Sequence, residues 1–194
     1  MRHKTKMRLV WIILAGLVLT AVGPCTITHK YGPYSGKVIE KETGDPIEGA
    51  YVLMIFYTEM YTPGGFVSKF VETRDATTDK NGEFKIGAYR AWAFRFPQRW
   101  KKDCFVTIFK PGYGAFPNNA SLIPEYIPFY SIPAKDHVKV SLPRLRTYED
   151  RLNNLHSIPP VGIPDEKLNS LMKLIDKEYN NLGFGNRDRK GMKR

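Results

Sequence analysis

Cysteine is the scarcest chemically reactive residue type in this chain of 194 residues, with one thiol at Cys25 and one at Cys104. Two thiols cannot build a disulfide-rich scaffold, and they cannot supply the ligands of a four-thiolate zinc site. A single Cys25–Cys104 disulfide is compatible with an oxidising compartment. The cysteine content therefore excludes two classes of small cross-linked protein.

Histidine is also scarce, and the motifs of common catalytic sites are missing. The four histidines stand in no metal-ligand spacing, and the chain has neither a Gly-x-Ser-x-Gly elbow nor a phosphate-binding loop. Residues 79–82 begin like a calcium loop, but Arg90 stands where the bidentate Glu is needed. We therefore predict no catalytic residues, no metal site and no cofactor.

The positive charge is not spread over the whole chain. Of the net charge of +11, residues 1–8 contribute +4 and residues 187–194 contribute another +4, which leaves +3 for the body. A body built to bind nucleic acid would stay strongly basic without its ends. The sequence therefore predicts no nucleic-acid partner.

The N-terminal segment, residues 1–25, has the layout of an export signal. Basic residues precede a continuous apolar run at 9–22, and small residues follow it. A helix of this run would reach about 21 Å, short of the hydrocarbon core of about 30 Å. We therefore predict export and expect residues 1–25 to be a signal or an anchor.

A cysteine just after such a run resembles the lipobox of bacterial lipoproteins, in which that cysteine becomes the lipidated first residue. In this sequence the cysteine is Cys25, but Pro24 and Val22 replace the usual Gly or Ala and the usual Leu. Proline fits a peptidase cleft badly because its φ is fixed and it has no N–H. Three outcomes stay open: lipidation of Cys25, cleavage elsewhere, and an uncleaved anchor.

From Ser35 onward the sequence has the composition and punctuation of short strands. The predicted strands span 36–40, 49–61, 66–78, 83–86, 104–109 and 137–142. Both faces of segment 49–61 are apolar, so another element must cover its second face. Asp79, Asn81 and Gly82 predict a tight hairpin turn. The body, residues 31–142, is thus expected to be a β-sandwich or a small barrel.

Four segments of this body resemble the carboxypeptidase regulatory-like domain. They are GKV at 36–38, GDPIEGAYV at 44–52, TDKNGEFKI at 78–86 and KPGY at 110–113. The resemblance implies a mainly β fold, a seven-stranded antiparallel β-sandwich of the transthyretin-like (prealbumin-like) type. It also implies a module without catalytic residues of its own. The aromatic insertion at 88–103 and the Pro-rich stretch at 116–133 depart from the family pattern.

Beyond the sandwich, residues 143–185 predict one or two helices. Thr147–Asp150 resembles a capping box, and Asp165 can cap a second helix with Gly183 after its end. The apolar stripe of this second helix consists of Leu168, Leu171, Met172, Ile175, Tyr179 and Leu182. It predicts docking over the second face of segment 49–61, with a partner-binding helix as the alternative. Residues 186–194 form a basic tail.

The segment Tyr89–Trp100 interleaves arginines with aromatic residues. In one interpretation Trp92, Phe94, Phe96 and Trp100 stack on sugar rings or anchor a protein partner. In the other, the segment is a long loop or a β-ribbon that packs these aromatics on its own domain.

Together these features predict a non-catalytic, exported binding or structural module of the cell envelope, either a membrane-anchored lipoprotein or a periplasmic protein. The expected partners are the membrane, through the N-terminal lipid or hydrophobic segment, and an envelope protein or glycan. The alternatives are a carbohydrate-binding module that uses residues 89–100 and a hydrolase of unrecognised type. A hydrolase needs a pocket with at least two convergent titratable groups whose pKa values are shifted.

Overall fold

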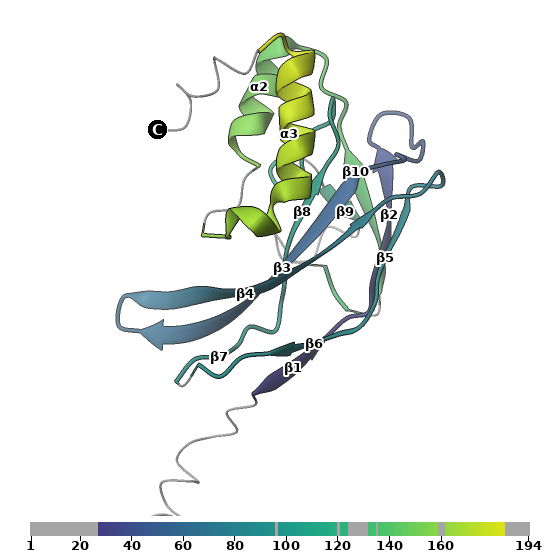
Figure 1. The fold of residues 1–194 in the computed structure, drawn as a ribbon. Helices are drawn as coiled ribbons and strands as arrows, with labels where there is room; N and C mark the ends of the chain where they lie inside the picture. The colour runs from purple at the N-terminus through teal and green to yellow at the C-terminus, as the bar shows by residue number, and fades with distance from the viewer. Residues whose placement is uncertain are drawn as a thin grey trace, which may run out of the picture.

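The structure is a computed structural model that describes residues 27–95, 97–119, 121–123, 132–134, 136–158 and 162–184. Strands account for 43% of the described residues and helices for 18%, which confirms the prediction of a mainly β protein. The described residues form ten strands in three sheets, and two α-helices lie at one end (Figure 1).

The first sheet has the strand order β5-β2-β10-β9. Its strands are β2 (Tyr34–Glu40), β5 (Glu83–Ile86), β9 (Ser121–Ile123) and β10 (His137–Leu142). β2 runs antiparallel to β5 but parallel to β10, with Ser35 opposite His137. This parallel pair departs from the antiparallel sandwich that the sequence predicted. Parallel neighbours need a long crossover, and here the rest of the β-structure supplies it.

The second sheet is built around β3 (Tyr51–Thr62). β3 pairs along its whole length with β4 (Gly65–Thr77) and on its other side with β7 (Arg99–Trp100) and β8 (Phe105–Phe109). The outer half of the β3–β4 hairpin projects from the body as an arm (Figure 1). The third sheet is a two-stranded antiparallel ribbon of β1 (Thr28–Tyr31) and β6 (Tyr89–Trp92).

The two apolar faces of β3 belong to two separate cores. Val52, Met54 and Phe56 point toward the first sheet and are completely buried with its residues. Leu53 and Ile55 point the other way and pack against the helices, in one cluster with Leu171. The helices α2 (Tyr148–His156) and α3 (Asn169–Asn181) therefore provide the cover that the sequence of β3 requires.

Both helices begin close to the predicted positions. The Thr147 hydroxyl accepts the Asp150 N–H at 3.1 Å and donates to the Asp150 carboxylate at 2.6 Å, which caps α2. Asp165 does not cap α3 as predicted, because it opens a short 3₁₀ turn, η1 (Asp165–Lys167), that precedes α3. Gly183, at φ +86°, follows the end of α3.

The predicted turn at 79–82 connects the two main sheets and does not close a hairpin. The Asp79 Oδ1 accepts the N–H groups of Asn81 and Glu83, both at 2.9 Å, and Gly82 has φ +75°. β4 pairs with β3, whereas the following strand β5 pairs with β2. The buried hydroxyl of Thr78 fixes this crossing, because it donates to the Ile47 carbonyl and accepts the Ala50 N–H.

Asn154 is a buried polar residue that joins α2 to the loop after β8. Its Oδ1 accepts the Ala115 N–H at 2.8 Å, and its Nδ2 donates to the Tyr113 carbonyl at 3.2 Å. We expect Asn154→Ala to lower the free energy of unfolding by about 2 kcal/mol, because the buried Ala115 N–H loses its acceptor. Urea denaturation measures this loss.

The neighbouring residue offers a matched control for this substitution. Asn153 lies on the exposed side of α2. Asn153→Ala should change the free energy of unfolding by less than about 0.5 kcal/mol. Equal losses for the two variants would contradict the role of Asn154.

Candidate functional site

The β1–β6 ribbon has one buried face and one exposed face. In its register Thr28 lies opposite Trp92 and Lys30 lies opposite Arg90. Side chains alternate between the faces of a strand, so these four residues share one face. We call this face, together with Phe94 two residues beyond Trp92, the ribbon face.

The opposite face of the ribbon is packed on the core. Tyr31 is buried, its ring lies 4.3 Å from that of Phe56, and its hydroxyl donates to the Lys101 carbonyl at 2.9 Å. The His29 ring stacks on Trp100 at 5.9 Å. Burial raises the pKa of Tyr31 and lowers the pKa of His29, so both side chains favour their neutral forms. These contacts fix the orientation of the ribbon.

The ribbon face presents large apolar side chains to solvent. Trp92 is 70% exposed and Phe94 is 67% exposed. The Ala93 N–H donates to the Ile27 carbonyl at 2.9 Å, which extends the strand pairing to these residues. Large aromatic residues that a packed ribbon holds in solvent are typical of a binding surface.

The four aromatic residues predicted as contacts do not form one group. Trp92 and Phe94 lie on the ribbon face, whereas Trp100 in β7 is only 9% exposed and packs with His29 and Tyr31. Phe96 lies outside the described residues, and so does the predicted lipidation site Cys25. The structure therefore joins two of the four residues in one exposed surface and assigns Trp100 to the core.

The arginines of the aromatic segment have different surroundings. Arg95 donates from Nη1 to the Phe70 carbonyl at 2.6 Å, which ties the segment to β4. Arg99 lies 3.4 Å from the Glu59 carboxylate. Within the described part of the chain, neither Arg90 nor the opposite Lys30 forms an ion pair with a carboxylate. The two cations of the ribbon face thus remain without a counter-charge there.

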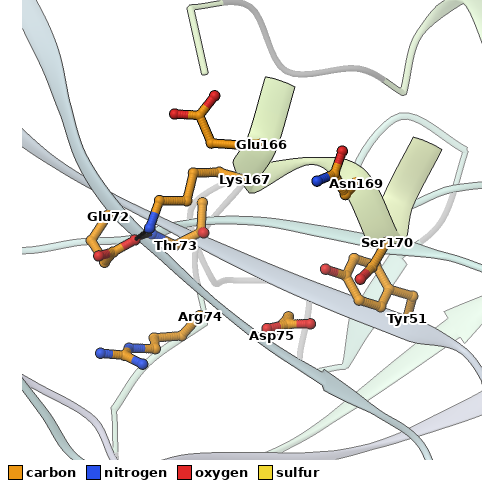
Figure 2. Close-up of a pocket in the computed structure, with 9 residues that line it drawn as sticks. All are labelled: Tyr51, Glu72, Thr73, Arg74, Asp75, Glu166, Lys167, Asn169 and Ser170. Carbon is orange, nitrogen blue, oxygen red and sulfur yellow. Dashed lines mark hydrogen bonds and ion pairs between the residues drawn. The ribbon is translucent and has the colours of Figure 1, made fainter. Parts of the chain in front are cut away.

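A second candidate is a polar pocket of about 280 Å³ between β4 and the start of α3 (Figure 2). Lys167 Nζ lies 2.7 Å from Glu72 Oε1 across it. Burial raises the pKa of Glu72, but the hydrogen bonds from Lys167 and the Thr73 N–H and the charges of Lys167 and Arg74 outweigh burial and lower it. Burial and the carboxylate of Asp75 raise the pKa of Tyr51.

These pKa shifts argue against acid–base chemistry in the pocket. Glu72 becomes a stronger acid and Tyr51 a weaker one, so both move away from neutrality. A hydrolase needs groups whose pKa values are moved toward the working pH. The ion pair of Glu72 with Lys167 in this pocket joins β4 to η1.

Elsewhere in the described residues, a pocket of about 430 Å³ is lined by Asp79, Glu83, Phe84, Lys85 and His137, and Tyr61, Phe66 and Val67 are exposed at the tip of the β3–β4 hairpin. In that part of the chain no cluster of His, Cys, Asp or Glu could hold a metal ion, and no helix is long and apolar enough to cross a membrane. Cys104 is a free thiol in the core, and burial raises its pKa. A thiol with a raised pKa is a poor nucleophile.

Comparisons with known proteins give no relative: no family model, no curated protein and no solved structure matches this chain.

Proposed function

We propose that this chain is a non-catalytic, exported module of the cell envelope, tethered to the membrane at its N-terminus, and that the ribbon face is its binding surface. The observation that carries the proposal is the exposure of Trp92 and Phe94 on a ribbon whose other face is locked into the core. Contact of these apolar side chains with water is unfavourable, so a partner that covers them would be bound favourably.

The architecture that we propose is a transthyretin-like sandwich of about seven strands, related to the carboxypeptidase regulatory-like domain. The motif segments support it by their positions. GKV lies in β2, GAYV leads into β3, and the turn at 79–82 leads into β5. The β1–β6 ribbon and the helices α2 and α3 would be additions to this sandwich.

A carbohydrate-binding module is the second candidate, and the exposed Trp92 ring favours it. Sugar rings stack on flat, solvent-exposed aromatic side chains. Burial of Trp100 leaves Trp92 and Phe94 as the stacking platform among the described residues. The aromatic surface available to a glycan is therefore smaller than the four-residue surface that the sequence predicted.

The tether is tested by the intact mass of the protein extracted from the membranes of its native host. We expect the mass of residues 25–194 plus a diacylglyceryl group and an acyl chain, because Cys25 follows the apolar run. An unmodified full-length mass in the membrane fraction would instead identify the apolar run itself as the anchor. Full-length protein only in the soluble cytosol would refute the proposed function.

The two cysteines provide a matched pair for this experiment. Cys25→Ser should abolish the added lipid mass, since the acceptor thiol is lost. Cys104→Ser changes the buried thiol and should leave the lipid mass unchanged. Lipid that remains on Cys25→Ser would show that another residue is modified.

A further inference from the structure

We infer that the ribbon face docks on the anionic phospholipid surface of the membrane to which the chain is tethered. This inference rests on the proposed function and adds a partner to it. Three features of the ribbon support it. They are two cations directly opposite each other, the position of the aromatic residues, and the short distance to the apolar run at 9–22.

The first feature is a pair of like charges on adjacent strands. Lys30 and Arg90 are directly opposite each other in the antiparallel register, and both are exposed. Like charges in such a pair destabilise a two-stranded ribbon. A ligand that carries negative charge relieves this repulsion. Because the charges lie side by side on one face, they fit a surface with many anionic groups, such as phospholipid headgroups.

The second feature is the position of the aromatic side chains beside these cations. Trp92 lies two residues from Arg90 on the same face, and the exposed Phe94 follows two residues beyond Trp92. Tryptophan is enriched at membrane–water interfaces because its ring is apolar and its N–H is polar. Cations beside Trp and Phe are typical of surfaces that lie in the headgroup region.

The third feature is the short connection between the ribbon and the apolar run. β1 starts at Thr28, six residues after the run ends at Val22. Six extended residues span at most about 22 Å. The ribbon lies at the end of the molecule far from α2 and α3 (Figure 1). If the run or Cys25 is held in the bilayer, the ribbon face cannot move far from the headgroups.

The sequence from β6 to the residues after β7 is itself rich in positive charge. Between residues 89 and 103 there are five basic residues and one acidic residue, Asp103. The rest of the body is much closer to neutral, because the net charge of the whole body is +3. Attraction of this segment to an anionic surface should therefore weaken as salt is added.

The test uses the full-length chain reconstituted into vesicles of phosphatidylcholine with and without phosphatidylglycerol. The Trp11→Phe variant leaves Trp92 and Trp100 as fluorophores. We expect phosphatidylglycerol vesicles with bromine near the headgroup end of the acyl chains to quench Trp92. The double variant Trp11→Phe/Trp92→Phe retains the buried Trp100 and should show no quenching. Flotation of the same vesicles reports the tether separately.

Removal of the two cations gives the quantitative test. Each basic residue at an anionic surface contributes about fivefold to partitioning, so Lys30→Gln/Arg90→Gln should lower the docked-to-undocked ratio about thirtyfold. Lys85→Gln/Lys139→Gln is the matched control, since it removes two exposed lysines from the first sheet. The thermal midpoint of Lys30→Gln/Arg90→Gln should not fall, because the substitution also removes the like-charge repulsion.

Each result decides a separate question. A chain that floats with vesicles while Trp92 escapes quenching overturns the docking and leaves the tether standing. A chain that does not float overturns both. Equal effects of the ribbon pair and the control pair also overturn the docking, because total charge would then explain the attraction. If soluble glycan fragments but not vesicles shift the Trp92 emission, the ribbon face is a carbohydrate site and not a lipid site.

Discussion

Replacement of Glu178 by alanine is expected to lower the free energy of unfolding by about 4 kcal/mol. Glu178 is 2% exposed, and its carboxylate accepts hydrogen bonds from Arg151 Nε at 2.6 Å and Arg151 Nη2 at 2.8 Å. The substitution leaves a partly buried guanidinium without its counter-charge. Chemical denaturation at neutral pH measures the loss.

The carboxylate of Glu178 is also a junction between three elements. In addition to Arg151 of α2, it accepts the Gly112 N–H at 3.1 Å and Asn181 Nδ2 at 3.3 Å. Its loss therefore loosens α3 from α2 and from the turn after β8. Glu48→Gln, on an exposed turn, is the control and should change the free energy of unfolding by less than about 0.5 kcal/mol. A small loss for Glu178→Ala would mean that Arg151 finds another partner.

The same ion pair makes stability depend on pH. Burial alone would raise the pKa of Glu178, but the hydrogen bonds from Arg151 and Asn181, the charge of Arg151 and the Gly112 N–H together lower it below 4.5. A group whose folded-state pKa is lowered stabilises the protein above its unfolded pKa. This stabilisation is lost as the pH falls through the folded-state pKa.

Glu178→Gln separates this effect from general acid denaturation. The variant has no carboxyl group at position 178, so its stability lacks this contribution at every pH. The difference in the free energy of unfolding between wild type and Glu178→Gln should be largest near neutral pH and should shrink below about pH 4.5. A constant difference down to low pH would contradict the lowered pKa.

The sequence pattern of α3 indicates that Glu178 is buried. It lies between Ile175 and Leu182, at the helical spacing of the apolar stripe of α3. A charged residue at such a position is almost never buried without a partner. The partner, Arg151, lies on another helix, and the sequence pattern does not specify which basic residue would be in reach. The buried position could be predicted, but the ion pair could not.

The strands that the sequence predicted are those with a strong local pattern. Segments 83–86 and 137–142 match β5 and β10, and segment 49–61 differs from β3 by two residues or fewer at each end. The sequence predicted no strand at β1 and left β6 open between a loop and a β-ribbon, because each has four residues of mixed polarity and their pairing joins residues about sixty positions apart. The parallel pairing of β2 with β10 depends on the whole topology, which local patterns do not encode.

The ribbon face could be predicted only in part for the same reason. Trp92, Phe94 and Trp100 are separated by even numbers of residues, so one continuous strand would have placed all three on one face. The chain instead leaves the strand after β6 and re-enters a different sheet at β7. Trp100 is therefore buried while Trp92 and Phe94 stay exposed. The like-charge pair Lys30–Arg90 became visible only once β1 and β6 were paired.

Gly82→Ala, in the turn at 79–82, should lower the free energy of unfolding by about 3 kcal/mol. Gly82 has φ +75°, and a Cβ there would lie 2.4 Å from the Val38 carbonyl oxygen and 3.1 Å from the Pro46 Cβ. The Val38 N–H also donates to the Gly82 carbonyl at 2.8 Å. A side chain would force the turn away from β2. Urea denaturation of the variant measures the loss.

Gly44→Ala is the control that separates backbone strain from close approach. Gly44 has φ +78°, nearly the same as Gly82, but a Cβ there meets no atom within 4 Å. Its substitution should therefore show the left-handed backbone penalty alone, about 1 kcal/mol. The additional loss at Gly82 measures how closely the turn approaches β2 where the chain passes between the two sheets. Equal losses would show that this turn can move away from β2 without disturbing the first sheet, and the sheet crossing would then depend on Thr78.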